Sequence, residues 1–84
     1  MHITLDFSSR IPLYLQIKAY LSEEIYTGSL EANSRLPSTR KLAAELNVNR
    51  ITIANAYSEL ESEGLIYGRS GSGTYVSPGK KRAL

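Results

Sequence analysis

The sequence contains no cysteine and only one histidine, and it has no long apolar run. Without cysteine, neither a disulfide framework nor a thiolate metal site can stabilise the chain. The single histidine, His2, stands next to the N-terminus and cannot form a zinc site by itself. No apolar stretch approaches the roughly 18 residues of a membrane span, and no signal-peptide core is present. The sequence therefore predicts a soluble domain in the cytoplasm.

The scarcity of reactive side chains also argues against an enzyme. Nucleophilic and acid–base catalysis need a nucleophile with a matched base and acid, yet cysteine is absent and histidine occurs once. Three glutamates lie close together at Glu59, Glu61 and Glu63, and we interpret them as a solvated acidic face and not as a paired-carboxylate site. We therefore expect no catalysis by these 84 residues.

The length and the charge distribution indicate one small domain with a polarised surface. Apolar residues make up 42% of the 84 residues and charged residues 21%, which favours a folded chain over a disordered one. The net charge of +2 is unevenly distributed: residues 35–50 carry four basic side chains and one glutamate, and residues 80–82 are all basic. This polarity is typical of a surface that meets a phosphate backbone, although ordinary solvated charge has the same pattern.

The most informative stretch is LPSTRKLAAELNVNRITIANA, residues 36–56. Pro37 precedes a helix that Ser38 is expected to cap, Asn47 can adopt the positive φ that ends a helix, and Asn49 can cap a second helix. The apolar stripes of these helices are Leu42, Ala43 and Leu46, and Ile53, Ala56, Tyr57 and Leu60. Two short amphipathic helices with so brief a connection must cross steeply to share a core, which predicts a helix-turn-helix.

The residues before this stretch predict another helix and two irregular segments. A helix is expected from Pro12 to Gly28, with an apolar side formed by Leu13, Ile17, Leu21 and Ile25. Residues 29–35 are expected to form a connecting loop. Residues 1–10 are expected to be extended and half-buried on one side, because polar residues alternate with Ile3, Leu5 and Phe7.

The residues after helix 49–63 predict a β-hairpin. Gly64 ends the helix, and β-branched and aromatic residues then form two short runs, residues 65–67 and 74–76, around a glycine-rich tip at residues 69–73. Tyr67 and Tyr75 are expected to form a cross-strand pair. A two-stranded hairpin is marginally stable alone, so we expect it to pack on the helices through Leu65, Ile66 and Val76.

Three helices followed by a two-stranded hairpin predict a winged helix-turn-helix, which is a mainly α fold with a small β-hairpin as its wing. Residues 1–11 are expected to be an N-terminal lead-in, and residues 12–77 are expected to form the winged helix-turn-helix domain. Residues 78–84 are then a basic tail or the start of an interdomain linker.

Several motifs in this order resemble one known family. The runs are PLYLQIKAYLSEEIYTGSL, LPSTRKLAAEL, NRITIANAYSELESEGLI and GSGTYV. Together they resemble the N-terminal DNA-binding domain of GntR-type bacterial transcription regulators, in order and without gaps over residues 12–77. The motifs LPSTR, AYSELESEGLI and GSGTYV are most similar to the MocR-type branch, and the YtrA-like branch is next.

The resemblance implies partners that lie outside these residues. In the MocR-type branch the domain precedes an aminotransferase-like domain that binds pyridoxal phosphate, and in the YtrA-like branch it precedes a short helical region. This sequence contains neither companion, so we expect no cofactor within it. The resemblance implies either a domain of a longer regulator or an unusually short protein. It also implies that the full-length regulator acts as a homodimer on two half-sites, since one such domain buries little DNA surface.

The first turn of the second helix of the helix-turn-helix holds the strongest candidate residues for DNA contact. Arg50 stands where recognition helices point at base edges and can bind guanine O6 and N7. Ile51 can contact a thymine methyl group, and Thr52 a phosphate or a base edge. Asn55, one turn further on, can bind adenine. Ala54 stands where some members of the family have a long basic residue, which places more of the base readout on Arg50 and Thr52.

The remaining DNA-binding candidates flank this turn in the sequence. The resemblance implies that Arg40 contacts the operator, while Ser38 and Thr39 stand at a helix N-terminus that attracts phosphate. Asn49 is expected to cap its helix and to touch phosphate. In the wing, the backbone at Gly71 can approach the minor groove and Arg69 supplies positive charge.

The function predicted from these features is sequence-specific binding of double-stranded DNA at an operator, with regulation of transcription. The helix over residues 49–63 would read the major groove, and the wing over residues 65–77 would contact the adjacent minor groove or backbone. The alternative is a winged helix that binds another protein without DNA specificity, since a fold does not fix a function. No membrane role is expected.

Overall fold

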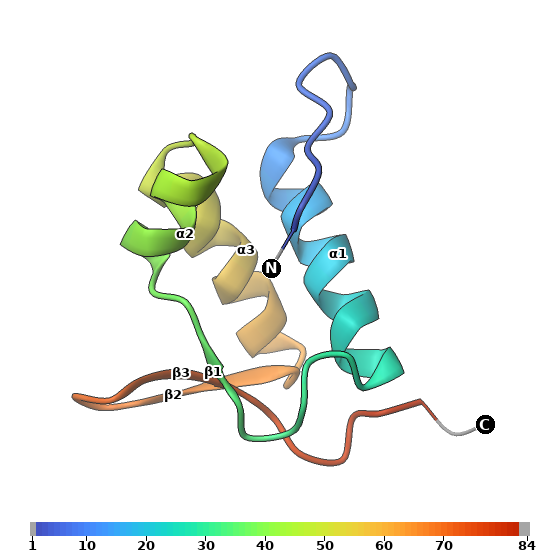
Figure 1. The fold of residues 1–84 in the computed structure, drawn as a ribbon, viewed down its shortest axis with the longest axis vertical. Helices are drawn as coiled ribbons and strands as arrows, with labels where there is room; N and C mark the ends of the chain where they lie inside the picture. Colours follow the sequence, from blue (N-terminus) through green and yellow to red (C-terminus); the bar gives the residue numbers. More distant parts are fainter. Residues whose placement is uncertain (1, 83–84) are drawn as a thin grey trace.

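The computed structural model describes residues 2–82, which form three helices above a small sheet (Figure 1). The elements are α1 (Leu13–Thr27), β1 (Arg35–Leu36), α2 (Thr39–Leu46), α3 (Arg50–Ser62), β2 (Ile66–Arg69) and β3 (Gly73–Val76). The helix α3 packs against both α1 and α2, and its C-terminal end contacts β2. The predicted fold class, a winged helix with three helices and a β-hairpin wing, is confirmed.

The helix ends lie where the sequence predicts them. Gly28 ends α1 in the left-handed conformation, with φ 84°. The side chain of Ser38 caps α2 by accepting a hydrogen bond from the backbone nitrogen of Lys41 at 3.1 Å. Asn47 ends α2 at φ 57°, and the carboxamide oxygen of Asn49 accepts a 2.8 Å hydrogen bond from the nitrogen of Ile51 to begin α3. These caps satisfy backbone groups that would otherwise lack partners at the steep turn between α2 and α3.

The core is formed by the predicted stripes of all three helices, except for Leu13 in the first turn of α1, and by the inner face of the sheet. Its fully buried members include Ile17, Leu21, Leu42, Ile53, Leu60, Leu65 and Val76. The expected hairpin contacts are confirmed, because Leu65, Ile66 and Val76 are each at most 3% exposed. Burial of these side chains fixes the wing to the helices, since a free hairpin of this length is unstable.

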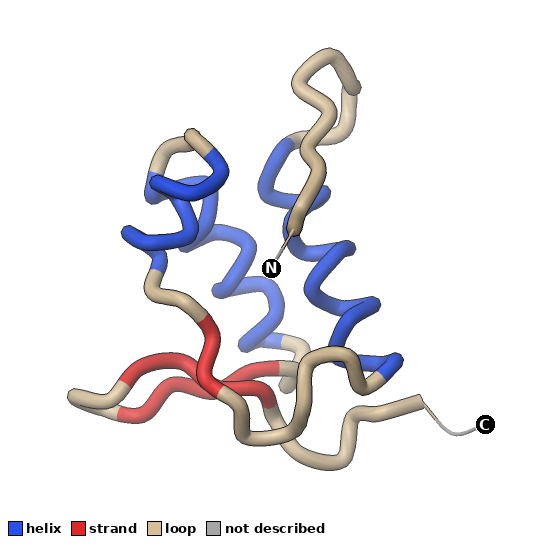
Figure 2. The backbone as a smooth tube through the Cα atoms, in the orientation of Figure 1, coloured by secondary structure: helices blue, strands red, loops and turns tan. Residues whose placement is uncertain are grey.

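The sheet has three strands where the sequence predicts two. Its order is β1-β3-β2, with antiparallel pairing throughout, and Figure 2 shows all three strands together below the helices. Residues 29–34 form the expected connection, but Arg35 and Leu36 pair with Tyr75 and Thr74. Leu36 is 2% exposed, so its burial draws this segment against the free edge of β3. A two-residue strand is too short to produce the alternation from which strands are predicted.

The expectation for the N-terminal residues is wrong at Phe7. Ile3 and Leu5 pack against the core as expected, whereas Phe7 is 67% exposed. The chain turns at this point, because the Asp6 carboxylate accepts hydrogen bonds from the backbone nitrogen and the hydroxyl of Ser8. The hydroxyl bond is the main cause that lowers the pKa of Asp6. The turn ends the alternation of buried and exposed residues before it reaches Phe7.

The three glutamates at the end of α3 and at its C-cap are exposed as expected, and two of them also pair with a lysine. The ammonium group of Lys18 in α1 lies 3.3 Å from the carboxylate of Glu59 and 2.5 Å from that of Glu63. The hydrogen bond to Glu63 is the largest cause that raises the pKa of Lys18 above its ordinary value. The packing of α1 on α3 brings these charges together over more than 40 residues of sequence, and their helical spacing alone does not reveal it.

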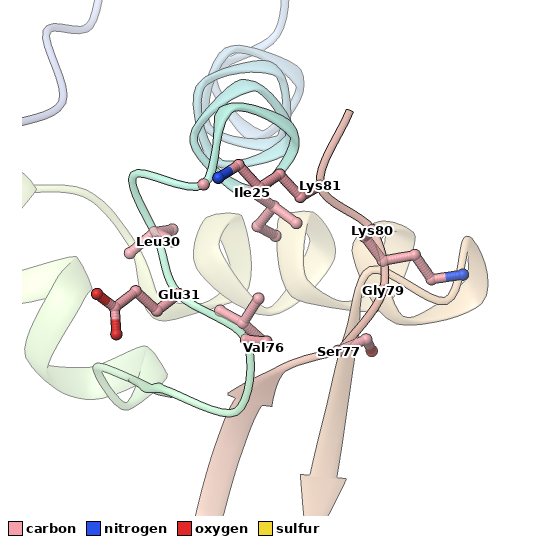
Figure 3. A pocket seen from close by; sticks show the side chains of 10 residues that line it. Ile25, Leu30, Glu31, Val76, Ser77, Gly79, Lys80 and Lys81 are labelled. Carbon is pink, nitrogen blue, oxygen red and sulfur yellow. The ribbon is translucent and has the colours of Figure 1, made fainter. Parts of the chain in front are cut away.

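The residues after the wing return to α1. The backbone nitrogen of Arg82 donates to the carbonyl of Tyr26, and its guanidinium lies over the Tyr26 ring and 3.2 Å from Glu23. Between this segment, α1 and β3 is a cavity of about 250 Å³ with Ile25, Leu30 and Val76 in its lining. Figure 3 shows that Lys80 and Lys81 at this cavity extend in opposite directions. Residues 1, 83 and 84, at the ends of the expected lead-in and tail, lie outside the described residues.

Candidate nucleic-acid interface

The N-terminal half of α3 presents one apolar and several polar side chains to solvent. Arg50, Ile51 and Asn55 are exposed, and Thr52 is half-buried. Ile51 is 66% exposed, whereas Ile53, two residues later, is fully buried. The opposite face of α3 holds the buried residues Ala56, Tyr57 and Leu60. The helix is therefore fixed by its inner face, and its outer face at the N-terminal end is free to meet a ligand.

The first turn of α2 contains the second group of predicted residues. Arg40 is exposed, Thr39 is half-buried and Ser38 is exposed at the cap position. The hydroxyl oxygen of Ser38 is already an acceptor for the Lys41 nitrogen, so Ser38 holds the helix start in place and leaves its hydroxyl proton free to donate. Asn49 has the same role at α3, where its carboxamide oxygen accepts from Ile51.

Two hydrogen bonds fix the chain at the two ends of α2. At its C-terminal end, the nitrogen of Val48 donates to the carbonyl of Ala43 at 3.0 Å and closes the helix where the turn begins. The hydroxyl of Tyr57 in α3 donates to the carbonyl of Pro37 at 2.7 Å, just before α2 begins. Burial, and to a lesser degree the charge of Glu45, raises the pKa of Tyr57 and keeps this donor protonated. The start of α2 is thus fixed to the middle of α3.

The wing tip is a three-residue turn, Ser70 to Ser72, between the paired residues Arg69 and Gly73. The nitrogen of Ser72 donates to the carbonyl of Arg69 at 2.9 Å. Gly71 has φ 74°, and a Cβ atom at this position would meet only open space. Glycine adopts this positive φ without strain, and asparagine and aspartate adopt it at a modest cost in conformational energy. The tip therefore exposes backbone that no side chain covers.

The outer face of the wing carries aromatic rings and a cation. Tyr67 and Tyr75 form the predicted cross-strand pair, with ring centroids 5.6 Å apart. The guanidinium of Arg69 lies 5.8 Å from the Tyr75 ring centroid, and the hydroxyls of Tyr75 and Ser72 are hydrogen-bonded. Arg69 is thus partly held on the sheet and remains exposed.

Sequence reasoning misses one basic residue at this surface. The sequence pattern identifies Arg35 only as part of a charged stretch, because a loop is expected there. In the structure it belongs to β1 and its guanidinium lies against Gly73 of the wing. The pairing of β1 with β3 joins segments 40 residues apart in the sequence, and no local pattern reports it.

Residues 2–82 do not have the features of two other kinds of site. No three histidine, cysteine, aspartate or glutamate side chains in this part of the chain come together as metal ligands would. No helix within the same range combines the length and the apolar character that crossing a membrane requires.

Comparison with protein families identifies one match. The model of the bacterial regulatory proteins of the gntR family matches residues 13–76, which include every helix and strand of the structure.

Two curated relatives represent different branches. The probable rhizopine catabolism regulatory protein MocR of Rhizobium meliloti is 41% identical over 75 residues, which are 89% of this chain and 15% of that protein. The transcriptional repressor YtrA of Bacillus subtilis is 39% identical over 82 residues, which are 98% of this chain and 63% of that protein. The chain thus spans less than two thirds of the length of either relative.

A solved structure extends the likeness to a complex with DNA. The DNA-binding domain of AraR, in complex with an operator, superposes on this chain with a TM-score of 0.80 at 30% identity. The superposition covers 92% of this chain and 99% of that domain.

Proposed function

Because the chain belongs to the GntR family of bacterial regulatory proteins, we propose that residues 12–77 bind double-stranded operator DNA and regulate transcription. The similarity to the AraR domain, which was solved in complex with an operator, supports this proposal. The relatives named as a repressor and as a regulatory protein also support it. DNA as the partner also means that the domain works in the cytoplasm.

The observation that carries the proposal is the exposed outer face of the N-terminal half of α3. A fixed helix with Arg50, Ile51 and Asn55 exposed on its outer side has the shape and the chemistry for the major groove. Arg50 would bind guanine O6 and N7, and Ile51 would contact a thymine methyl group. Thr52 would bind a phosphate or a base edge, and Asn55 would bind adenine N6 and N7.

The neighbouring elements would set the position of α3 on the duplex. Arg40, Ser38 and Thr39 at the start of α2 would bind the backbone, aided by the free N–H groups of that helix end, and Asn49 would add a phosphate contact at α3. In the wing, the uncovered backbone at Gly71 would enter the adjacent minor groove and Arg69 would add charge.

A single domain of this size would bind an operator weakly. The regulator would therefore act as a homodimer that places two copies of α3 on two half-sites. In a MocR-type regulator, pyridoxal phosphate would be held by the aminotransferase-like companion domain, and residues 2–82 would contribute only DNA binding.

Fluorescence anisotropy tests the proposal. A duplex is selected from a random library by the wild-type chain, and its affinity is compared with that of a scrambled duplex over a range of salt concentrations. The logarithm of the affinity should fall linearly with the logarithm of the salt concentration. Arg50→Ala should cost about 1–3 kcal/mol on the selected duplex and relax the base preference. Arg10→Ala, which removes an exposed arginine from the N-terminal segment, is the matched control.

The outcomes separate the proposal from the alternative function. Binding that prefers the selected duplex and loses this preference in Arg50→Ala supports operator reading by α3. Binding with preference intact in Arg50→Ala would remove that residue from base readout. If the wild-type chain binds no duplex even at low salt and high concentration, either a missing partner domain is needed for dimeric binding or the winged helix serves a protein partner, and the proposal that residues 12–77 bind DNA by themselves fails.

A further inference from the structure

Arg35 lies between two parts of the proposed interface that are distant in the sequence. It is the first residue of β1, and it pairs with Tyr75 of β3. A Cβ atom placed on Gly73 would lie 2.8 Å from the Arg35 Nε and 3.3 Å from its Nη2. The guanidinium therefore rests directly on the wing backbone, and any side chain at position 73 would push it away.

Arg35 also lines a groove beside the start of α2. This open groove of about 500 Å³ runs between β1 and α2, and its lining consists of Arg35, Leu36, Pro37, Ser38, Lys41 and Glu45. The groove thus contains two cations and one carboxylate together with the capping residue of α2. Arg35 thus borders both the wing and this groove, and it lies between the two surfaces that flank α3 in the proposed interface.

The charge of Arg35 is free to act on a ligand. Among residues 2–82, the ion pairs join Lys18 to Glu59 and Glu63 and Arg82 to Glu23, and Arg35 is in none of them. A guanidinium presents a planar fork of donors that matches the oxygens of a phosphate. Because the wing backbone already supports it, Arg35 loses less conformational freedom on binding than a free surface arginine would.

On the basis of the operator-binding function proposed above, we infer that Arg35 binds a DNA backbone phosphate between the start of α2 and the wing. The contact carries no base information, because phosphates are the same at every sequence. Its effect is to fix the position of the wing relative to α3 on the duplex. Gly73 is needed for this position of Arg35, because a side chain at residue 73 would displace the guanidinium.

The first test is the salt dependence of binding. Arg35→Ala should weaken binding to the library-selected duplex and to a scrambled duplex by a similar factor, about tenfold at low salt. It should also reduce the slope of log affinity against log salt by about one. Arg35→Lys should keep the slope and recover only part of the affinity, since an ammonium lacks the planar fork. Arg10→Ala again serves as the control, and circular dichroism checks that each variant is folded.

The second test locates the phosphate. Methylphosphonate groups replace single phosphates along the selected duplex and remove one negative charge at a time. If Arg35 binds a phosphate, one position should weaken wild-type binding and have no effect on Arg35→Ala. A scan in which every position affects both proteins equally, or an Arg35→Ala variant with unchanged slope, overturns the inference and leaves the proposed function standing. If the wild-type chain binds no duplex, both fail together.

Discussion

The hydroxyl of Tyr57 in α3 donates a 2.7 Å hydrogen bond to the carbonyl oxygen of Pro37, the residue before the cap of α2. This bond connects the recognition helix of the proposed interface to the segment that leads from β1 into α2. Tyr57 is 7% exposed, so the carbonyl and the hydroxyl depend on each other for hydrogen bonding.

We expect Tyr57→Phe to lower the free energy of unfolding by about 1–2 kcal/mol, because the ring still fills the core but the Pro37 carbonyl loses its donor. Chemical denaturation followed by circular dichroism measures this change. Tyr14→Phe is the control, since Tyr14 is half-buried and its hydroxyl forms no hydrogen bond with residues 2–82. Equal decreases in the free energy of unfolding of the two variants would show that the hydrogen bond from Tyr57 to Pro37 does not stabilise the fold.

The buried and exposed faces of α3 should respond oppositely to truncation. Leu60 is fully buried, so Leu60→Ala should destabilise the fold by about 2–5 kcal/mol through lost burial and a cavity. Ile51 is 66% exposed, so Ile51→Ala should change stability by less than about 0.5 kcal/mol while weakening binding to duplexes that contain thymine at its contact. Denaturation midpoints and anisotropy measure the two effects, and a large loss of stability in Ile51→Ala would contradict the assignment of the faces.

Gly71 allows a direct test of the wing tip. Asparagine tolerates positive φ, so Gly71→Asn should keep the turn and the helicity while placing a side chain where the DNA backbone would approach. We expect weaker binding to the selected duplex. Gly79→Asn is a closely matched control, because Gly79 has φ 77° and open space around it but lies outside the wing. Equal affinity of both variants would mean that the tip does not enter a groove.

The ion pairs of Lys18 should make stability depend on pH at the alkaline end. Contact with Glu63 and Glu59 raises the pKa of Lys18 above 10.5, so its contribution is complete below about pH 10.5 and is lost as the pH rises through the raised value. The difference in unfolding midpoint between the wild type and Lys18→Met should therefore shrink above that pH. Lys80→Met, which removes an exposed lysine outside the ion pairs of residues 2–82, should show no such trend. A difference that persists at high pH would point to packing of the Lys18 stem.

Features set by neighbouring residues could be predicted from the sequence. Ser38, Asn47 and Asn49 act within one or two turns of their own helices, and their side chains determine where α2 and α3 begin and end. The buried stripe of α3 could also be predicted, because its periodicity is local. The stacking of Tyr67 on Tyr75 followed from the short distance between the two strands of one hairpin.

Features set by contacts between distant segments could not be predicted in this way. Arg35 has its place because β1 pairs with β3, and a two-residue strand has no periodicity of its own. Lys18 comes within ion-pair distance of Glu59 and Glu63 only when α1 packs on α3. The prediction for Phe7 fails for a different reason, since the hydrogen bonds from Ser8 to Asp6 turn the chain where simple alternation predicts extension. The DNA contacts of individual residues stay predictions.

The pairing of β1 with β3 also has a consequence for the order of folding. Contacts within the helices and between α2 and α3 close short loops, whereas β1 has no partner until Tyr75, 40 residues after Arg35, is available. During synthesis from the N-terminus, all three helices are complete before β3 exists, and until then Leu36 has no sheet to cover it. The strand β1 is therefore paired only once β3 is available, although it precedes α2 and α3 in the chain.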